Sequence, residues 1–269
     1  MAPSGKEGQE VLRLEGVTKA FGPNLVLDHL NLSLTQGENL AILGRSGSGK
    51  SVLLKIIIGL LEPDSGLVSL WGQPTESLSE DAWVPLRRHM GLVFQSGALF
   101  DSMSVFDNVA FPLLERKIHS ESEIQRIVAE RLEWVGLKDA GRLSPSELSG
   151  GMRRRVALAR TIAVNPEFLL YDEPTAGLDP LTGRKISRLM RDLDTKLQST
   201  SILVTHDIEC ARMVSSRWAY LSDGKVLADG APAELLSSKE PEIREFMLPP
   251  GVEGSTNKAQ DLPSSSRGQ

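Results

Sequence analysis

The stretch Gly44-Arg45-Ser46-Gly47-Ser48-Gly49-Lys50-Ser51 decides the fold of this chain. It has the pattern of a phosphate-binding loop: glycine, four free residues, glycine, lysine, and then serine or threonine. The apolar run 40–43 before it predicts a buried strand, and segment 52–57 after it predicts the start of a helix. Because strand, loop and helix come in the required order, we interpret the stretch as a nucleotide-phosphate site rather than a Gly-Ser turn.

The residue types in this loop suit the binding of an anion. The glycines permit backbone conformations that a side chain would forbid, so successive N–H groups can point at one phosphate. Lys50 is expected to bring charge to the β- and γ-phosphates, and the Ser51 hydroxyl to ligate Mg²⁺. The candidate nucleotide-binding residues here are Gly44, Arg45, Ser46, Gly47, Ser48, Gly49, Lys50, Ser51 and Val52.

Composition limits the class of protein. At 269 residues and 40% hydrophobic content, the chain can form one large domain or two small ones. The longest apolar stretch, 52–61, is broken by Lys55 and Gly59, and residues 1–10 are polar, so we expect neither a membrane span nor a secretory signal. The single cysteine, Cys210, excludes an internal disulfide and suits the cytoplasm, and the net charge of −5 gives no overall footprint for nucleic acid.

Hydrophobic patterning predicts alternating strands and helices along the chain. Phe21 is expected in a short loop between the first two strands, where it either stacks on an adenine ring or fills the core. The expected strands are 11–17, 25–34, 40–43, 67–71, 92–94, 168–173, 201–205 and a hairpin around Asp223-Gly224; the expected helices begin or lie at 52–57, 121–135, 153–163, 181–197, 233–236 and 243–247.

The segment from Leu99 to Leu114 is apolar and carries few charges. A core helix explains part of this segment but not the loop 97–104. We therefore expect some of its side chains to face outward as a docking surface.

A second candidate anion site lies at Ser149, Gly150 and Gly151, where the start of a predicted helix leaves backbone N–H groups free. The arginine triplet 153–155 follows these residues directly. We interpret it as the solvated start of a helix rather than a nucleic-acid site, because the overall balance is acidic.

Two predicted strands end in residues that suit phosphate chemistry. Asp172 and Glu173 end one strand, and two carboxylates there are costly unless they are used. Asp172 suits a metal shell, and Glu173 suits the base that aligns and deprotonates an attacking water. His206 ends the next strand at the same edge, so we interpret it as a γ-phosphate contact rather than a structural histidine.

In their order, these motifs resemble those of the nucleotide-binding subunits of ABC transporters over nearly all of residues 10–247. They are Phe21, Gly44 to Ser51, Gln95, the signature Leu148 to Met152, Asp172-Glu173, the loop Ala176 to Asp179, and His206. The resemblance implies an α/β P-loop NTPase fold: a RecA-like core, an antiparallel β subdomain and an inserted helical subdomain at about 96–156. Flexible segments are expected at 1–9 and 248–269.

The resemblance also implies a mechanism with ATP and Mg²⁺ as cofactors. Two subunits would pair head to tail, so that Ser149, Gly150 and Gly151 of one close over the γ-phosphate held by the other. Asp179 would join the nucleotide site. Gln95 would sense metal and water, and Ser51 and Asp172 would hold Mg²⁺.

Met152 stands where glutamine is usual in the signature. With segments 44–52 and 94–102, it resembles the Mla/Mce-associated lipid-transport ATPases. This finer resemblance implies phospholipid transport, an integral membrane permease, an MCE-domain partner, no nucleic acid, and a peripheral position on the cytoplasmic face of the inner membrane. The alternatives are an importer ATPase for a polar solute such as an amino acid, and a non-transport ABC ATPase acting on nucleic acid or ribosomes.

Overall fold

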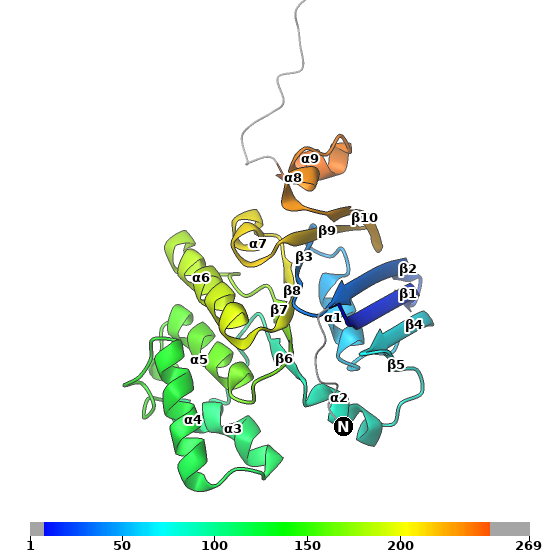
Figure 1. Ribbon diagram of the computed structural model, residues 1–269. Coiled ribbons are helices and arrows are strands. Elements are labelled where there is room, and N and C mark those ends of the chain that lie inside the picture. Colours follow the sequence, from blue (N-terminus) through cyan, green and yellow to red (C-terminus); the bar gives the residue numbers. More distant parts are fainter. Residues whose placement is uncertain (1–7, 248–269) are drawn as a thin grey trace, which may run out of the picture.

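The computed structural model describes residues 8–247 of the chain (Figure 1). The flexible segments expected at 1–9 and 248–269 lie outside this range, apart from residues 8 and 9.

A six-stranded sheet forms the centre of the protein, with the strand order β10-β9-β3-β8-β7-β6. Five neighbouring strands run parallel and β10 is antiparallel to β9. The strands are β3 (Asn39–Leu43), β6 (Met90–Val93), β7 (Phe168–Asp172), β8 (Thr200–Thr205), β9 (Arg217–Ser222) and β10 (Lys225–Gly230). Parallel strands need crossover connections, so helices cover both faces of the sheet.

A second sheet is antiparallel, with the order β2-β1-β4-β5. Its strands are β1 (Glu10–Phe21), β2 (Asn24–Thr35), β4 (Ser65–Leu70) and β5 (Gln73–Pro74). Helix α1 (Lys50–Ile57) contributes Leu53 and Ile57 to one apolar core with residues of both sheets, such as Leu14 and Ile42. The antiparallel sheet therefore packs over α1 on one side of the central sheet (Figure 1).

The remaining helices cover the other side of the central sheet and its ends, except the segment with Trp83 and Leu86, which packs on the side of α1 (Figure 1). They are α2 (Glu80–Arg87), α3 (Val105–Arg116), α4 (Glu121–Trp134), the 3₁₀ turn η1 (Pro145–Glu147), α5 (Gly150–Ile162), α6 (Pro180–Leu197), α7 (Ile208–Val214), α8 (Pro232–Leu236) and α9 (Pro241–Met247). Local sequence sets where several of these helices begin, because side-chain oxygens of Ser104, Ser120, Ser149 and Asp179 accept hydrogen bonds from the first turn.

Alternation along the central strands separates two apolar cores. In β3, Leu40 and Ile42 pack toward α1, whereas Ala41 and Leu43 pack toward the helices on the opposite face. Each parallel strand is therefore buried on both faces, which explains why its sequence is a continuous apolar run.

The predicted fold class is confirmed, two local predictions need correction, and one helix was missed. Phe21 is the last residue of β1 rather than part of a loop. Phe94 lies beyond β6 and is 40% exposed, because the chain leaves the sheet after Val93. Helix α2 was not predicted; the side chain of Ser79 caps its first turn.

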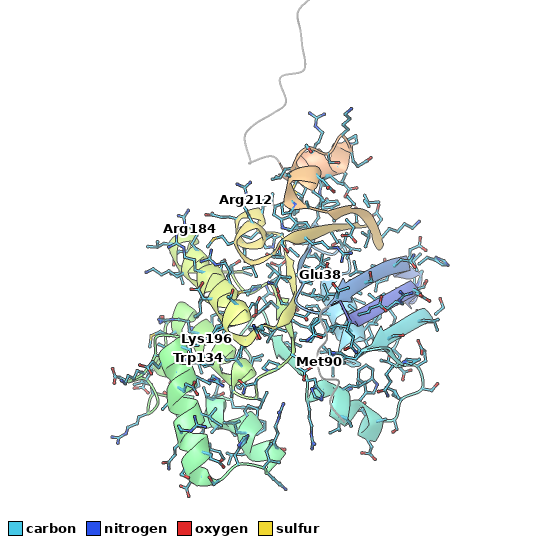
Figure 2. The ribbon with its side chains drawn as sticks, viewed as in Figure 1. Glu38, Met90, Trp134, Arg184, Lys196 and Arg212 are labelled. Atoms are coloured by element: carbon cyan, nitrogen blue, oxygen red, sulfur yellow. The ribbon has the colours of Figure 1, made fainter. Side chains whose placement is uncertain are left out.

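A cation–π contact between Trp134 and Lys196 joins α4 to α6, and a second one, between Trp134 and Arg131, lies within α4. The ring of Trp134 contacts the guanidinium of Arg131 at 3.9 Å and the ammonium of Lys196 at 3.7 Å, measured to the ring centroid. Figure 2 shows Trp134 and Lys196 next to each other. Cation–π contacts of this kind contribute about 0.5–2 kcal/mol, so they hold the α3–α4 pair against the core.

A buried carboxyl group links α6 to the central sheet. Asp194 accepts hydrogen bonds from the hydroxyls of Tyr171 (2.6 Å), Ser199 (3.2 Å) and Ser201 (2.9 Å). Burial raises the pKa of Asp194 to about 6, although the three hydrogen bonds oppose this shift. The folded chain therefore binds the Asp194 proton more tightly than the unfolded chain does.

The pKa of Asp194 leads to a testable pH dependence. Because the folded-state pKa is raised, the stabilisation by this proton is present at low pH and is lost as the pH rises through about 6. We expect the free energy of unfolding of the wild type, minus that of Asp194→Asn, to fall by about 2 kcal/mol from pH 4 to pH 7. Denaturant unfolding at each pH measures the difference, with the exposed Asp192→Asn as the control. A flat difference would contradict the assignment.

Candidate functional site

A cavity of about 410 Å³ lies beside the carboxyl ends of β3, β7 and β8. Parallel strands present such an edge for ligands. Ten of the predicted site residues line it: Phe21, Ser46, Gly47, Gly49, Lys50, Ser51, Val52, Gln95, Glu173 and His206. Val26 lines it as well, although its place in an alternating strand gave no signal for this.

The phosphate-binding loop holds its own lysine. The buried Nζ of Lys50 donates to the carbonyl oxygens of Gly44 and Arg45, both at 2.8 Å. An ammonium group has three donors, so one is left for a ligand. Burial lowers the pKa of Lys50, and the charges of Glu173 and Asp172 oppose that shift.

The C-terminal helix α9 reaches this loop, which the sequence did not predict. Nη2 of Arg45 forms an ion pair with Oε2 of Glu245 at 2.8 Å. Gly44, Arg45 and Ser48 form the part of the loop that does not line the cavity.

Two oxygen-bearing side chains from distant segments meet at the end of β7. The Ser51 hydroxyl at the start of α1 donates to Oδ1 of Asp172 at 3.0 Å. Burial raises the pKa of Asp172, partly opposed by the hydrogen bond from Ser51. Hydroxyl, carboxylate and amide oxygens are the ligands that Mg²⁺ prefers. Ser51 and Asp172 fit such an ion, because a cation beside the Asp172 carboxylate would offset its desolvation.

The Glu173 carboxylate is held from both sides. Nδ1 of His206 lies 3.0 Å from Oε1, and the Thr205 hydroxyl donates to Oε2 at 3.3 Å. The backbone of Glu173 has a φ of 46°, in the left-handed region, and its N–H donates to Val204 at 2.9 Å. Backbone strain of this kind is typical of functional sites. Thr205 had been predicted only as the end of a strand, and its position directly before His206 was the available signal.

Phe21 lies at the mouth of the cavity. Its side chain is 49% exposed at the end of β1, so it does not fill the core. The sequence left open whether Phe21 stacks on an adenine ring or fills the core, and the structure excludes the core position. An exposed aromatic ring at this position can stack on a planar ligand.

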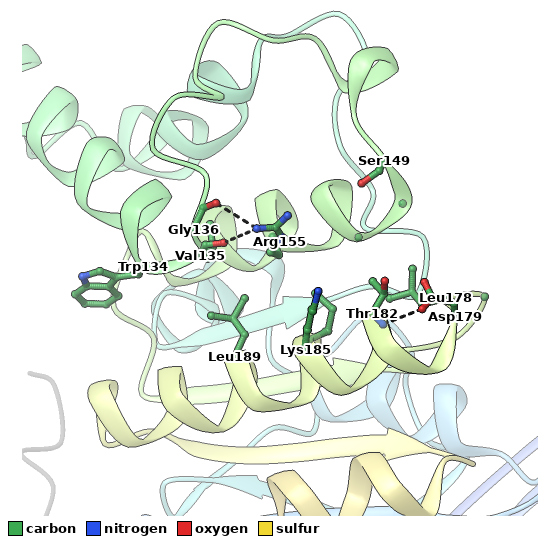
Figure 3. Close-up of a pocket in the computed structure, with 14 residues that line it drawn as sticks. Trp134, Val135, Gly136, Ser149, Arg155, Leu178, Asp179, Thr182, Lys185 and Leu189 are labelled. Atoms are coloured by element: carbon green, nitrogen blue, oxygen red, sulfur yellow. Dashed lines mark hydrogen bonds between the residues drawn. The ribbon is translucent and has the colours of Figure 1, made fainter.

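Four further predicted site residues line a different cavity, of about 670 Å³ (Figure 3), whereas Asp172 lines neither of the two cavities. Ser149, Gly150 and Gly151 border it at the start of α5, and Asp179 borders it at the start of α6. Hydrogen bonds from Thr182 lower the pKa of Asp179. Within one chain, these four residues and the phosphate-binding loop line separate cavities.

The interpretation of the arginine triplet as solvated is wrong for Arg154, which is only 6% exposed. Arg155 is half-buried and donates to the carbonyl oxygens of Val135 and Gly136, both at 3.2 Å (Figure 3). Arg153 is exposed. Helical periodicity was a signal for Arg154, since it lies three and four residues before the buried Ala157 and Leu158.

Within residues 8–247, no helix combines the length and the apolar composition that crossing a membrane requires.

Comparisons with known proteins agree with this geometry. The family described as "ABC transporter" matches residues 27–176. The "Intermembrane phospholipid transport system ATP-binding protein MlaF" of Haemophilus influenzae is 42% identical over 239 residues, which cover 89% of this chain and 90% of that protein. The "Probable ribonucleotide transport ATP-binding protein mkl" of Mycobacterium leprae is 39% identical over 251 residues, which cover 92% of this chain and 72% of that protein.

A solved structure with ligands is also similar. The structure of the ATP-binding cassette MJ0796, a dimer in a post-hydrolysis state bound to ADP and Pi, matches with a TM-score of 0.75 at 37% identity. The match covers 82% of this chain and 98% of that chain.

Two glycines of the phosphate-binding loop allow a matched test of its geometry. A Cβ at Gly49 (φ 100°) would lie 2.8 Å from the carbonyl oxygen of Val26, whereas one at Gly47 (φ 84°) would meet nothing within 4 Å. We expect Gly49→Ala to lower the free energy of unfolding by about 2 kcal/mol or more, and Gly47→Ala by about 1 kcal/mol, the cost of a left-handed residue alone. Denaturant unfolding measures both; equal losses would contradict the close approach of β2.

Proposed function

Since this chain belongs to the ABC transporter family of ATPases, we propose that it couples ATP hydrolysis to the movement of a lipid, in the first place a phospholipid, through a separate membrane permease. The observation that carries the lipid assignment is the 42% identity to the phospholipid-transport protein MlaF over 89% of the chain. The similarity to mkl favours a second candidate cargo, a ribonucleotide.

The chemistry of the side chains around the cavity indicates which part of ATP each of them binds. Phe21 stacks on the adenine ring, and the N–H groups of loop 44–52 and the third donor of Lys50 hold the phosphates. Ser51, Asp172 and Gln95 supply oxygen ligands for Mg²⁺. A bound magnesium ion would neutralise part of the triphosphate charge.

Glu173 acts as the base for the attacking water. Its carboxylate accepts the proton as the water oxygen bonds to the γ-phosphorus and the bond to the bridging oxygen of ADP breaks. Thr205 and Nδ1 of His206 hold the carboxylate. The other ring nitrogen of His206 remains for the γ-phosphate, which is consistent with the exposure of 55% of the side chain.

The active unit is a head-to-tail homodimer. Ser149, Gly150, Gly151 and Asp179 line a separate cavity from the phosphate-binding loop, so one chain alone does not enclose the γ-phosphate. A second copy brings its α5 N-terminus, with free N–H groups, to the open face of the first cavity. The dimeric arrangement of MJ0796 supports this proposal.

The permease docks on an apolar groove of about 430 Å³ that follows Gln95. Phe94 and Phe100, each 40% exposed, and Phe111 line this groove, and the rings of Phe100 and Phe111 lie 4.8 Å apart. Exposed apolar surface of this kind marks an interaction site. The helical subdomain, about 96–156, carries the groove toward the membrane, so the chain is peripheral on the cytoplasmic face. An MCE-domain protein completes the complex on the outer side of the permease.

Glu173→Gln tests the catalytic assignment. The amide cannot take the water proton, so we expect ATP turnover to fall at least about 10²-fold, while ATP affinity stays within a few-fold of the wild-type value. Steady-state ATPase assays and nucleotide titration measure the two. Glu209→Gln, an exposed carboxylate on α7, is the control. Turnover near the wild-type rate would remove Glu173 from this role.

Co-purification tests the transporter and its cargo. The chain is purified with its partners from detergent-solubilised membranes, and mass spectrometry identifies proteins and bound small molecules. We expect a permease, an MCE-domain protein and phospholipid. A permease with a solute-binding protein would preserve the ATPase mechanism and overturn the lipid assignment, and a bound ribonucleotide other than ATP or ADP would favour the second cargo.

Phe100→Ser tests the docking groove in the same purification. A polar side chain at the groove removes apolar contact area, so we expect recovery of the permease to fall about 10-fold or more, the loss expected from about 1.4 kcal/mol at an interface hot spot. Leu227→Ser on β10, where Leu227 is 45% exposed outside the groove, is the matched control. Equal recovery with both variants would place the permease elsewhere.

A further inference from the structure

Arg154 connects three segments that carry proposed site residues. From the first turns of α5, its Nη1 donates to the carbonyl oxygens of Phe94, at 3.0 Å, and Gln95. Its Nη2 donates to the carbonyl oxygen of Ala176 at 3.2 Å. One guanidinium group therefore bonds to the loop of Gln95 and to the loop that leads to Asp179.

The surroundings of Arg154 are unusual for a buried cation. Among residues 8–247, no carboxylate forms an ion pair with it, and its side chain is buried. A buried charge without a counter-ion is costly unless hydrogen bonds satisfy it. Here the hydrogen-bond acceptors are carbonyl oxygens of two loops. The buried guanidinium of Arg154 is therefore stabilised only when both loops are in place.

A second arginine on the same helix supports the same loop. Nη1 of Arg160 donates to the carbonyl oxygen of Ala98 at 2.8 Å, and its Nη2 donates to that of Gly97 at 3.1 Å. The backbone from Phe94 to Ala98 is thus tied to α5 at both ends. Arg154 differs from Arg160 because it also reaches the loop after β7.

We propose that Arg154 is a positioning residue of the ATPase site: its guanidinium sets Gln95 and the 176–179 loop at fixed positions relative to Ser149, Gly150 and Gly151. This inference rests on the proposed function. The carbonyl oxygens that it binds belong to two loops: one contains Gln95, which lines the nucleotide cavity, and the other leads to Asp179, which lines the second cavity. Arg154 therefore aligns the residues around the bound phosphates with the residues that close over the γ-phosphate of a partner subunit. Its side-chain hydrogen bonds within residues 8–247 go to Phe94, Gln95 and Ala176, and none goes to the phosphate-binding loop.

The geometry requires arginine rather than another cation. A guanidinium carries five N–H donors in a planar fork, which can serve carbonyl oxygens on two loops at once. Lysine at this position keeps the charge but has a single nitrogen. It can reach one loop well, and the other loses its donor.

The test compares Arg154→Met, Arg154→Lys and the exposed control Arg153→Met, each in the full chain purified within its membrane complex. Because the side-chain hydrogen bonds of Arg154 within residues 8–247 do not reach the phosphate-binding loop, we expect Arg154→Met to keep the Kd for ATP, measured by titration, within about 2-fold. We expect its kcat to fall at least 10-fold. Arg154→Lys should give an intermediate kcat, 3- to 10-fold below the wild type, and Arg153→Met should match the wild type.

The outcomes separate this inference from its premise. If the wild-type complex hydrolyses ATP and Arg154→Met has the same kcat, the inference is overturned and the proposed function stands. A loss of ATP affinity parallel to the loss of kcat also overturns it, because it indicates a general structural role. If Arg154→Met does not fold, Arg154→Lys decides on the same criteria. A wild-type complex without ATP hydrolysis would overturn the proposed function itself.

Discussion

The register of β8 between β3 and β7 is the constraint on which the rest of the site depends. In this register Leu43 pairs with Thr205, and Asp172 pairs with Val204. The phosphate-binding loop, the two carboxylates and His206 all follow these residues in the chain, so they emerge at one edge. A slip of one residue would exchange the faces of β8 and move Ile202 and Val204 out of the core that contains α1. The apolar cores thus fix the positions of the polar groups.

Two buried cations of this protein, Lys50 and Arg154, are held by backbone carbonyl oxygens. Lys50 is held by Gly44 and Arg45, and Arg154 by Phe94, Gln95 and Ala176. Carbonyl oxygens satisfy the donors without cancelling the charge. The positive charge of Lys50 therefore remains available to an anion. The same type of contact orders the loop in each case.

The fold places the predicted phosphate-binding residues and the start of α5 at two separate cavities. The phosphate-binding loop and the ends of the parallel strands line one cavity, and the start of α5 lines another. The helical layer is attached to the core through side-chain contacts such as Trp134 with Lys196, and through arginines on α5. Both cavities are open to solvent in the single chain, which is the form expected of a site completed by a second copy.

Much of this arrangement follows from local sequence. The apolar runs predicted the parallel strands, because a strand buried on both faces must be apolar throughout. The phosphate-binding loop could be recognised because all its donors are contiguous, from Gly44 to Ser51. Asp172, Glu173 and His206 could be placed at one edge because parallel strands share the direction of their carboxyl ends. Whether Phe21 faces the core or the cavity was not encoded locally, because both interpretations fit its position at a strand end.

By itself, the sequence determined the fold class, most of the strands and helices and the identity of the residues at the strand ends, since these depend on periodicity and on motifs of a few residues. Tertiary structure alone decided the roles of Arg154, Thr205 and the ion pair between Arg45 and Glu245. Arg154 bonds to carbonyl oxygens 60 residues before it and 22 residues after it. A contact of that range depends on how packed segments meet, and carbonyl oxygens, which every residue has, leave no mark in the sequence.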